Sequence, residues 1–393
     1  MKNLAAPLVA LLMMAPACGG DRDQSPGPQS PPAATTTAPD ETTTATPMET
    51  TTTTPNPAPP PVPQSERIQD TMRSLVAAFN AHDARRIASL YTPDAVVAGV
   101  GNRGWTEDSG RALIEASYGK LFTAFPDVKW ASPRVYVTND AAIQEWVLTG
   151  TQQGPLGSLS ATNRGAGING ASVYLFDTEG RIRREHTYYD ALAMGAQLGT
   201  YKGKARALAT LPAGEPQFIV AAGTPGENRW LDAARAFYST YEQRDEKAFG
   251  LLLAKEAART SYLLPDDRKG DRAVVEEFRV FVRAFPDLDV DTRNMWGFGD
   301  RVVTENVIST QKAGAWATAR ATQKPASLHT LDILRFGEDG KITELTSYGS
   351  VLELVLQSGQ DQKGVQPWLP SGGEQGTTPG QQNSPGTGGQ APR

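Results

Sequence analysis

Apolar side chains near residue 70 recur at the three- and four-residue spacing of a helix that is buried on one face. The residues in this pattern are Ile68, Met72, Leu75, Val76 and Phe79. The same spacing predicts a second helix through 87–91 and a third from 110 to 125, which Pro126 ends. We therefore expect the folded part of the chain to begin with three helices.

The sequence that follows these helices has short apolar segments bounded by turn residues, as β-strands do. Strands are predicted at 95–100, 135–137, 141–149, 171–176 and 181–189. Helices first and strands afterwards indicate an α+β fold, in which a curved antiparallel sheet wraps the three N-terminal helices.

The same order of elements returns further along the chain. The Ala-Phe-Pro-Asp motif at 124–127 recurs at 284–287, and Tyr188 recurs as Tyr348, a constant offset of 160 residues. Self-similarity at a fixed offset predicts two tandem domains of the same fold. Each copy also shows which polar residues the other copy lacks.

Composition divides the rest of the chain. We expect a lipoprotein-type signal peptide at 1–18, a disordered Thr/Pro-rich tether at 19–65, domain 1 at 66–199, a linker at 200–226, domain 2 at 227–359, and a disordered Gly/Gln/Pro-rich tail at 360–393. The tether and the tail have too little apolar surface to offset the entropy lost on ordering.

Cys18 is the single cysteine of the chain. It follows an apolar run at 4–14 and the small residues 15–17, the pattern of a bacterial export signal that ends at a lipidated cysteine. Ordinary cleavage before Cys18 is the alternative, because Ala-Pro-Ala also suits signal peptidase. We expect a lipid anchor on Cys18 that holds the protein to the membrane of the bacterial cell envelope, in the outer membrane if the host has one.

The charge pattern argues against nucleic acid as a partner. The formal net charge is −5, and the lysines and arginines form no basic patch. With three histidines in the chain, a histidine-rich metal site is not expected, while a site made of carboxylates alone stays open. We expect neither a metal nor an organic cofactor.

Several motifs of domain 1 resemble one known family. They are the Phe-Pro-Asp at 125–127, the hairpin at 176–182, and the run Glu-His-Thr-Tyr-Tyr-Asp at 185–190, followed by Gln-Leu-Gly at 197–199. Together they resemble the SnoaL-like polyketide (ester) cyclase branch of the nuclear transport factor 2-like superfamily. The resemblance implies a cone-shaped fold with an interior pocket, in which an aspartate at the place of Asp190 acts as acid and base.

Side chains alternate along a strand, so His186, Tyr188 and Asp190 share one face of the last strand of domain 1. The catalytic candidates are Asp190 and His186. The candidates for ligand contact are Tyr188, Asn169, Trp146, Glu145 and His329. For Asp190 the alternative is a helix cap at the start of 191–198, for His186 a half-exposed strand residue, for Tyr188 a packing residue, and for Glu145 a solvated sheet face.

The second copy acts as a control for these candidates. The offset of 160 places Thr346 and Ser350 where domain 1 has His186 and Asp190, so any chemistry of the family is expected in domain 1 and a degenerate site in domain 2. His329 in turn stands at the place of Asn169.

Three hypotheses for function remain open. The first is a cyclase- or isomerase-like enzyme that binds a small apolar, carbonyl-containing molecule in domain 1. The second is a protein that binds a hydrophobic ligand without turning it over, and the third is an interaction platform. In each, the two domains are expected to pair within one chain as an intramolecular pseudo-dimer.

Overall fold

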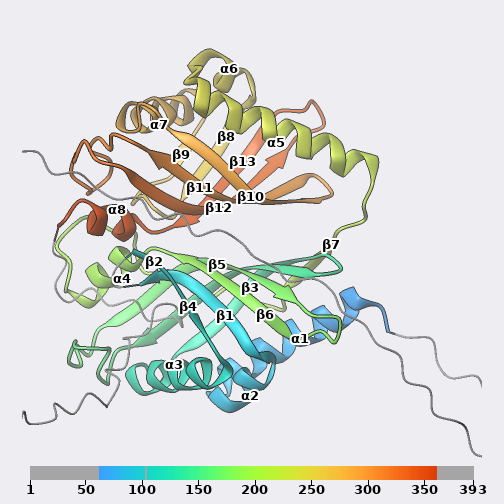
Figure 1. The fold of residues 1–393 in the computed structure, drawn as a ribbon, viewed down its shortest axis with the longest axis vertical. Helices are drawn as coiled ribbons and strands as arrows, with labels where there is room; N and C mark the ends of the chain where they lie inside the picture. The colour runs from blue at the N-terminus through green and yellow to red at the C-terminus, as the bar shows by residue number, and fades with distance from the viewer. Residues whose placement is uncertain (1–61, 102–103, 361–393) are drawn as a thin grey trace, which may run out of the picture. The chain divides into compact units, whose positions relative to one another are not determined.

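The computed structural model describes residues 62–101 and 104–360. Cys18, the predicted signal peptide, most of the predicted tether and nearly all of the predicted tail lie outside the described residues. Contacts join both copies of the repeat into one unit. Each copy has helices on one face of a curved sheet, as Figure 1 shows, so the predicted α+β fold with two tandem domains is confirmed.

The first domain begins with two helices, and the third helix follows the first two strands; each helix presents an apolar stripe to the sheet. Its helices are α1 (Gln64–Asn80), α2 (Ala84–Ser89), α3 (Arg111–Ala124) and the short C-terminal α4 (Ala191–Leu198). Its strands are β1 (Tyr91–Gly101), β2 (Gly104–Ser109), β3 (Lys129–Val137), β4 (Ala141–Thr151), β5 (Gly165–Phe176) and β6 (Ile182–Tyr189). In α1 the predicted stripe is buried at Ile68, Met72, Leu75 and Phe79.

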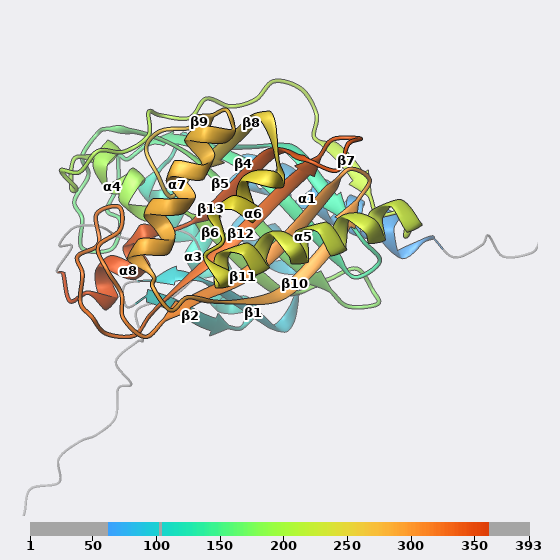
Figure 2. The same ribbon diagram turned by 90° about the horizontal axis from the view of Figure 1, so that it is seen from above.

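The second domain repeats this order. Its helices are α5 (Pro225–Gln243), α6 (Glu246–Leu251), α7 (Asp271–Ala284) and α8 (Val351–Gln357). Its strands are β8 (Leu253–Ser261), β9 (Arg268–Lys269), β10 (Asp289–Phe298), β11 (Arg301–Thr310), β12 (Ala326–Phe336) and β13 (Ile342–Gly349). Figure 2 shows α5 and α7 lying across the strands of this sheet.

The two sheets have matching topology. The first has the order β2-β1-β6-β5-β4-β3-β7, and the second has the order β10-β11-β12-β13-β8-β9, which is the same path read in reverse without the last strand. The extra strand β7 (Gln217–Val220) belongs to the linker and pairs in parallel with β3. The pairs β1–β6 and β8–β13 are also parallel, and the remaining pairs are antiparallel.

The outer faces of the two sheets pack against each other. The buried apolar residues of this contact are Tyr136, Ile143, Ala171, Val173 and Tyr188 from the first sheet, and Phe298, Val303, Leu331, Ile333 and Tyr348 from the second. Two equivalent hydrogen bonds cross it, from Tyr348 Oη to Glu145 at 2.7 Å and from Tyr188 Oη to Glu305 at 2.9 Å. Both faces of each sheet are therefore buried, one against helices and one against the other sheet.

Candidate functional site

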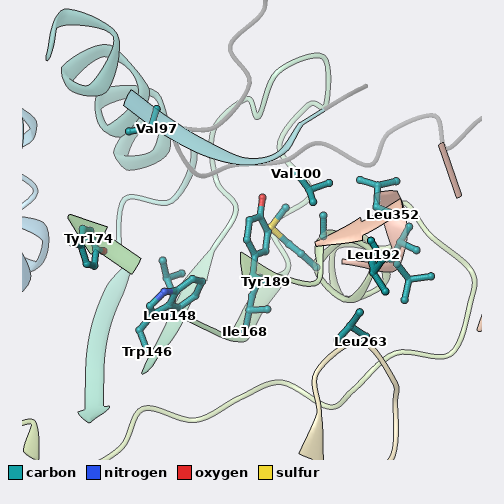
Figure 3. Close-up of a cluster of buried hydrophobic side chains, with 14 of the residues drawn as sticks. Val97, Val100, Trp146, Leu148, Ile168, Tyr174, Tyr189, Leu192, Leu263 and Leu352 are labelled. Atoms are coloured by element: carbon teal, nitrogen blue, oxygen red, sulfur yellow. The ribbon is translucent and has the colours of Figure 1, made fainter. Parts of the chain in front are cut away.

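The interior of the first domain is filled by aromatic side chains. Trp146 on β4 is 2 % exposed and packs at right angles to Trp130, with ring centroids 6.3 Å apart. Figure 3 shows Trp146 near Leu148, Ile168 and Tyr189 in this core. A large ring at the centre of a small cone leaves little space for a ligand.

The glycine opposite Trp146 shows how tightly this core is packed. Gly170 lies beside Trp146 in the β4–β5 register, and a Cβ atom added there would lie 2.1 Å from the indole ring. Real atoms do not approach so closely, so Trp146 depends on glycine at position 170.

A buried glutamate completes the interior of the first domain. Glu185 on β6 is 2 % exposed and accepts hydrogen bonds from Tyr91 Oη at 2.6 Å and Thr187 Oγ1 at 3.0 Å. Burial raises the pKa of Glu185, and the hydrogen bond from Tyr91 opposes that effect. This carboxyl faces the core, on the opposite side of β6 from His186.

The second domain contains a cavity of about 50 Å³ in the equivalent place. Its apolar lining includes Phe237, Phe278, Phe281, Ile308, Trp316 and Leu328. Its polar lining includes Tyr238, Tyr241, Arg259, Ser261, Glu277, Thr330, Asp332 and Ser347. A single water needs about 10–15 Å³ by this kind of measure, so the cavity has room for a small organic group.

The repeat explains why the interior of the second domain contains this cavity. At the offset of 160, Asn306 stands in place of Trp146, and Val290 stands in place of Trp130. Two indoles are thus replaced by much smaller side chains, while Gly170 is replaced by Thr330. The space that the first domain fills with rings remains as a cavity in the second.

Asp332 is the central polar residue of this cavity. It is 6 % exposed and accepts hydrogen bonds from Tyr238 Oη and Asn306 Nδ2, each at 3.0 Å. Ser347 Oγ donates a further short bond to the other carboxyl oxygen. Burial raises the pKa of Asp332, and the nearby Arg259 guanidinium opposes this.

An ion pair lies beside Asp332. Arg259 Nε donates to Glu277 at 2.7 Å, and Arg259 Nη1 donates to Ser347 Oγ at 3.0 Å. Burial acts to lower the pKa of Arg259, but Glu277, Tyr241 and Asp332 together more than offset it and the pKa rises. Arg259 Nη2 makes no hydrogen bond to the described residues, so this nitrogen has donors to offer a ligand oxygen.

Asp190 caps a helix at the domain contact. Its carboxyl accepts from the backbone N–H groups of Leu192 and Ala193, both at 3.2 Å, and lies 3.4 Å from Ser350 Oγ, its own counterpart in the repeat. Burial raises the pKa of Asp190 to about 7, although the cap hydrogen bonds lower it. Asp190 lies outside the lining of the second-domain cavity and of two further pockets among the described residues. The position of Asp190 is therefore that of a helix cap, the alternative to a catalytic role.

His186 and Tyr188 share a face, as expected, but this is the outer face of β6. His186 Nδ1 lies 2.8 Å from Glu305 Oε1, the same oxygen that accepts from Tyr188. The expected interior position is instead taken by Glu185 and Thr187, because alternation along β6 sends the two sets to opposite sides.

The remaining candidates are also distributed over both faces. Glu145 lies in the contact between the sheets and accepts from Arg134 Nε at 2.6 Å. His329 lies on the outer face of β12, with Nδ1 2.8 Å from Glu353, while Asn169 is half-buried on β5. Trp146 is buried in the hydrophobic core of the first domain. The sequence analysis missed Asp332 and Arg259. The sequence signal that could have found Asp332 is a carboxylate inside the apolar segment from Leu331 to Leu334.

Two further observations limit the chemistry of the described part. Within residues 62–101 and 104–360, no three His, Cys, Asp or Glu side chains are arranged to hold a metal ion. Over the same ranges, no helix is both long and apolar enough to cross a membrane.

Comparison with known families identifies both domains. The SnoaL-like domain matches residues 72–185, and the SnoaL-like polyketide cyclase family matches residues 231–358. The chain therefore carries two SnoaL-like domains in tandem. No match was found among curated protein sequences.

Solved structures similar to this chain each span about one domain. A protein described as a SnoaL-like polyketide cyclase from Jannaschia sp. CCS1 is 13 % identical, with a TM-score of 0.31, over 34 % of this chain and 95 % of its own. A hypothetical protein with a ketosteroid isomerase-like fold from Catenulispora acidiphila is 18 % identical, with a TM-score of 0.29, over 33 % and 95 %. An LEH-like epoxide hydrolase from M. tuberculosis is 15 % identical, with a TM-score of 0.27, over 33 % and 89 %.

Proposed function

We propose that this protein binds a small, largely apolar, carbonyl-containing molecule in the cavity of the second domain. The observation that carries the proposal is a cavity with aromatic and aliphatic walls and one polar end. Ligand sites commonly combine apolar walls with a few placed polar groups. Domain 1, expected from sequence to hold the ligand, has Trp146 at the position that corresponds to Asn306, which hydrogen-bonds to the cavity residue Asp332.

The polar end suits an oxygen acceptor on the ligand. Arg259 Nη2 offers unused N–H donors, and burial raises the pKa of Tyr241, so that its phenol stays protonated as a donor. Glu277 holds the Arg259 side chain in place from the other side, at 2.7 Å. A carbonyl oxygen meeting Arg259 would place the apolar part of the ligand against Phe278 and Trp316.

The test compares cyclohexanone with cyclohexane by ligand-observed NMR on the full chain. Cyclohexanone should bind with the higher affinity, because the hydrocarbon leaves Arg259 without an acceptor. The double variant Asn306→Trp with Thr330→Gly transplants the packed core of domain 1 and should abolish binding. Glu185→Gln in domain 1 is the matched control and should bind normally. Binding that survives the double variant, provided the variant is folded, contradicts the proposal.

Proton transfer by Asp332 is a second candidate function. Burial raises the pKa of this carboxyl, and it lines the cavity, which favours a role as a base toward a C–H next to a ligand carbonyl. Its two oxygens already accept hydrogen bonds from protein groups, so binding is the primary proposal. Deuterium exchange at the α-carbons of cyclohexanone measures this activity. Exchange at the buffer rate, unchanged in Asp332→Asn, excludes it.

We also propose that the chain is anchored to the cell envelope through a lipid on Cys18. The support is the export-signal pattern that ends at the single cysteine. Mass spectrometry of the mature N-terminus in a bacterial host should find a diacylated Cys18, lost in Cys18→Ala. An unmodified N-terminus contradicts the anchor.

A further inference from the structure

A groove of about 410 Å³ lies where the outer faces of the two sheets diverge. We name it the intersheet groove, and its principal lining residues are Trp105, Arg184, His186, Arg293, Glu305 and His329. Its volume lies in the range of small-molecule sites, roughly 300–1,000 Å³. It is separate from the cavity of the second domain and independent of the function proposed for that cavity.

Two histidines of the groove are held by buried carboxylates. His186 Nδ1 lies 2.8 Å from Glu305, and His329 Nδ1 lies 2.8 Å from Glu353. The glutamates are 2 % and 1 % exposed, whereas the histidine side chains are 18 % and 20 % exposed. A carboxylate can only accept, so the hydrogen-bonded Nδ1 carries a proton, and in the neutral form of the ring Nε2 is an acceptor.

The repeat supplies a comparison for this half of the contact. Glu145, the counterpart of Glu305, is paired with the guanidinium of Arg134 at 2.6 Å. In the same register opposite Glu305 stands Asn294, which is neutral and donates at 2.7 Å. Glu305 thus lacks the permanent cation that Glu145 has.

In the other half of the contact an arginine of the linker, Arg206, lies over an aromatic pair and is itself paired with Asp267 at 2.6 Å. There Tyr262 stacks on Tyr348, with centroids 4.8 Å apart, and the guanidinium carbon of Arg206 lies 5.0 Å from the Tyr262 ring centroid. In the groove, Trp105 packs on Tyr188 at 5.2 Å in the corresponding way, and its stacking partner at 4.3 Å is His329 instead of an arginine.

The arginines of the groove do not compensate for these missing charges. Arg184 is paired with Glu107 at 2.9 Å, and Arg293 is paired with Asp291 at 2.6 Å. Among the described residues, no arginine or lysine forms an ion pair with Glu305. The groove therefore has histidine nitrogens as acceptors and the carboxylate of Glu305, which no arginine of the described residues neutralises, whereas Arg134 neutralises Glu145 in the other half of the contact.

From these observations we propose that the intersheet groove binds a small organic cation, an alkylammonium or a guanidinium. The cation donates hydrogen bonds to Nε2 of His186 and His329, and it lies near the Glu305 carboxylate and the rings around Trp105. It supplies the charge that Arg134 supplies to Glu145 in the other half.

Calorimetric titration with methylguanidinium and n-butylammonium tests the proposal, with urea and butan-1-ol as neutral controls of similar shape. Both cations should bind and both neutral controls should not. Asn294→Arg recreates the pairing of Arg134 with Glu145, and it should weaken cation binding about tenfold or more, as loss of a charged hydrogen bond does. Asn294→Ala removes the same amide without adding charge, and should bind within about threefold of the wild type by the same reasoning.

A second variant tests the proposal in case Asn294→Arg does not fold. Glu353→Gln removes carboxylate charge without changing volume and should also weaken cation binding. Cyclohexanone binding should be unaltered in Asn294→Arg, and cation binding unaltered in Asp332→Asn, so the two sites are tested separately. Equal cation affinity in Asn294→Arg and Asn294→Ala, or neutral compounds binding as tightly as cations, overturns the proposal.

Discussion

Replacement of Asp190 by asparagine should stabilise the protein at neutral pH. The carboxyl is 9 % exposed, and burial raises its pKa from 3.8 to about 7. The folded state therefore holds a proton that the unfolded state has released, so the contribution of Asp190 to stability is full below pH 4 and is lost as the pH rises through 7.

The size of this effect follows from the two pKa values. The difference between 3.8 and about 7 corresponds to about 4 kcal/mol, an upper limit to the loss. Asparagine caps helices as well as aspartate does, but its single oxygen keeps one of the two bonds to Leu192 and Ala193, which costs about 1 kcal/mol. Asp190→Asn should therefore gain up to about 3 kcal/mol at pH 8 and lose up to about 1 kcal/mol at pH 4, where only the lost cap bond counts.

Urea unfolding of the full chain at pH 4 to 8 measures this prediction. Asp177→Asn is the control of opposite sign, because hydrogen bonds and the Arg181 charge outweigh desolvation and lower the pKa of Asp177. Asp177 contributes stability above its unfolded pKa, and this is lost as the pH falls. If Asp190→Asn is less stable than the wild type at pH 8, with the same slope against pH, the buried carboxyl is stabilised as an anion and the reasoning fails.

Two further predictions concern packing and the domain contact. Gly170→Ala places a methyl group against Trp146 and should destabilise the fold by about 1–3 kcal/mol, whereas Gly119→Ala in α3, with nothing within 4 Å, should stabilise it by about 0.8–1.0 kcal/mol. Equal unfolding midpoints for the two variants would contradict the filled core. Tyr348→Phe leaves the buried Glu145 with one donor fewer and should lower the free energy of unfolding by about 1.5–3 kcal/mol. Tyr348→Phe as stable as the wild type would show that this bond adds nothing.

The fold was predictable because its signals are local. The spacing of Ile68, Met72 and Leu75 indicates a helix buried on one face, and the constant offset of 160 shows that one domain is repeated. Within the predicted linker, the structure has a short strand, β7.

The inner and outer faces of β6 were harder to distinguish. Alternation separates His186 and Tyr188 from Glu185, but it does not say which set faces the helices. Normally the polar set faces water, or lines a pocket in an enzyme. Here the outer face is buried against the second sheet, so polar residues such as Glu305 lie inside the contact instead.

The location of the cavity depends on volumes that the repeat makes visible. Aligning Trp146 with Asn306, and Ser172 with Asp332, shows one core with a large ring and one with a carboxylate. Knowing that both positions point inward requires the strand register, which pairs Trp146 with Gly170. The sequence comparison relied on His186 and Asp190 near the end of β6, and for this reason it placed the ligand site in domain 1.

The most direct measurement of the central claim is the contact between bound cyclohexanone and methyl groups of the core. Isotope-filtered NOEs on methyl-labelled protein distinguish the domains, because Ile308 and Leu328 line the cavity, and Leu148 and Ile168 are their counterparts in domain 1. We predict NOEs to Ile308 and Leu328. NOEs to Leu148 and Ile168 instead, or to neither pair, would contradict a ligand site in the second domain.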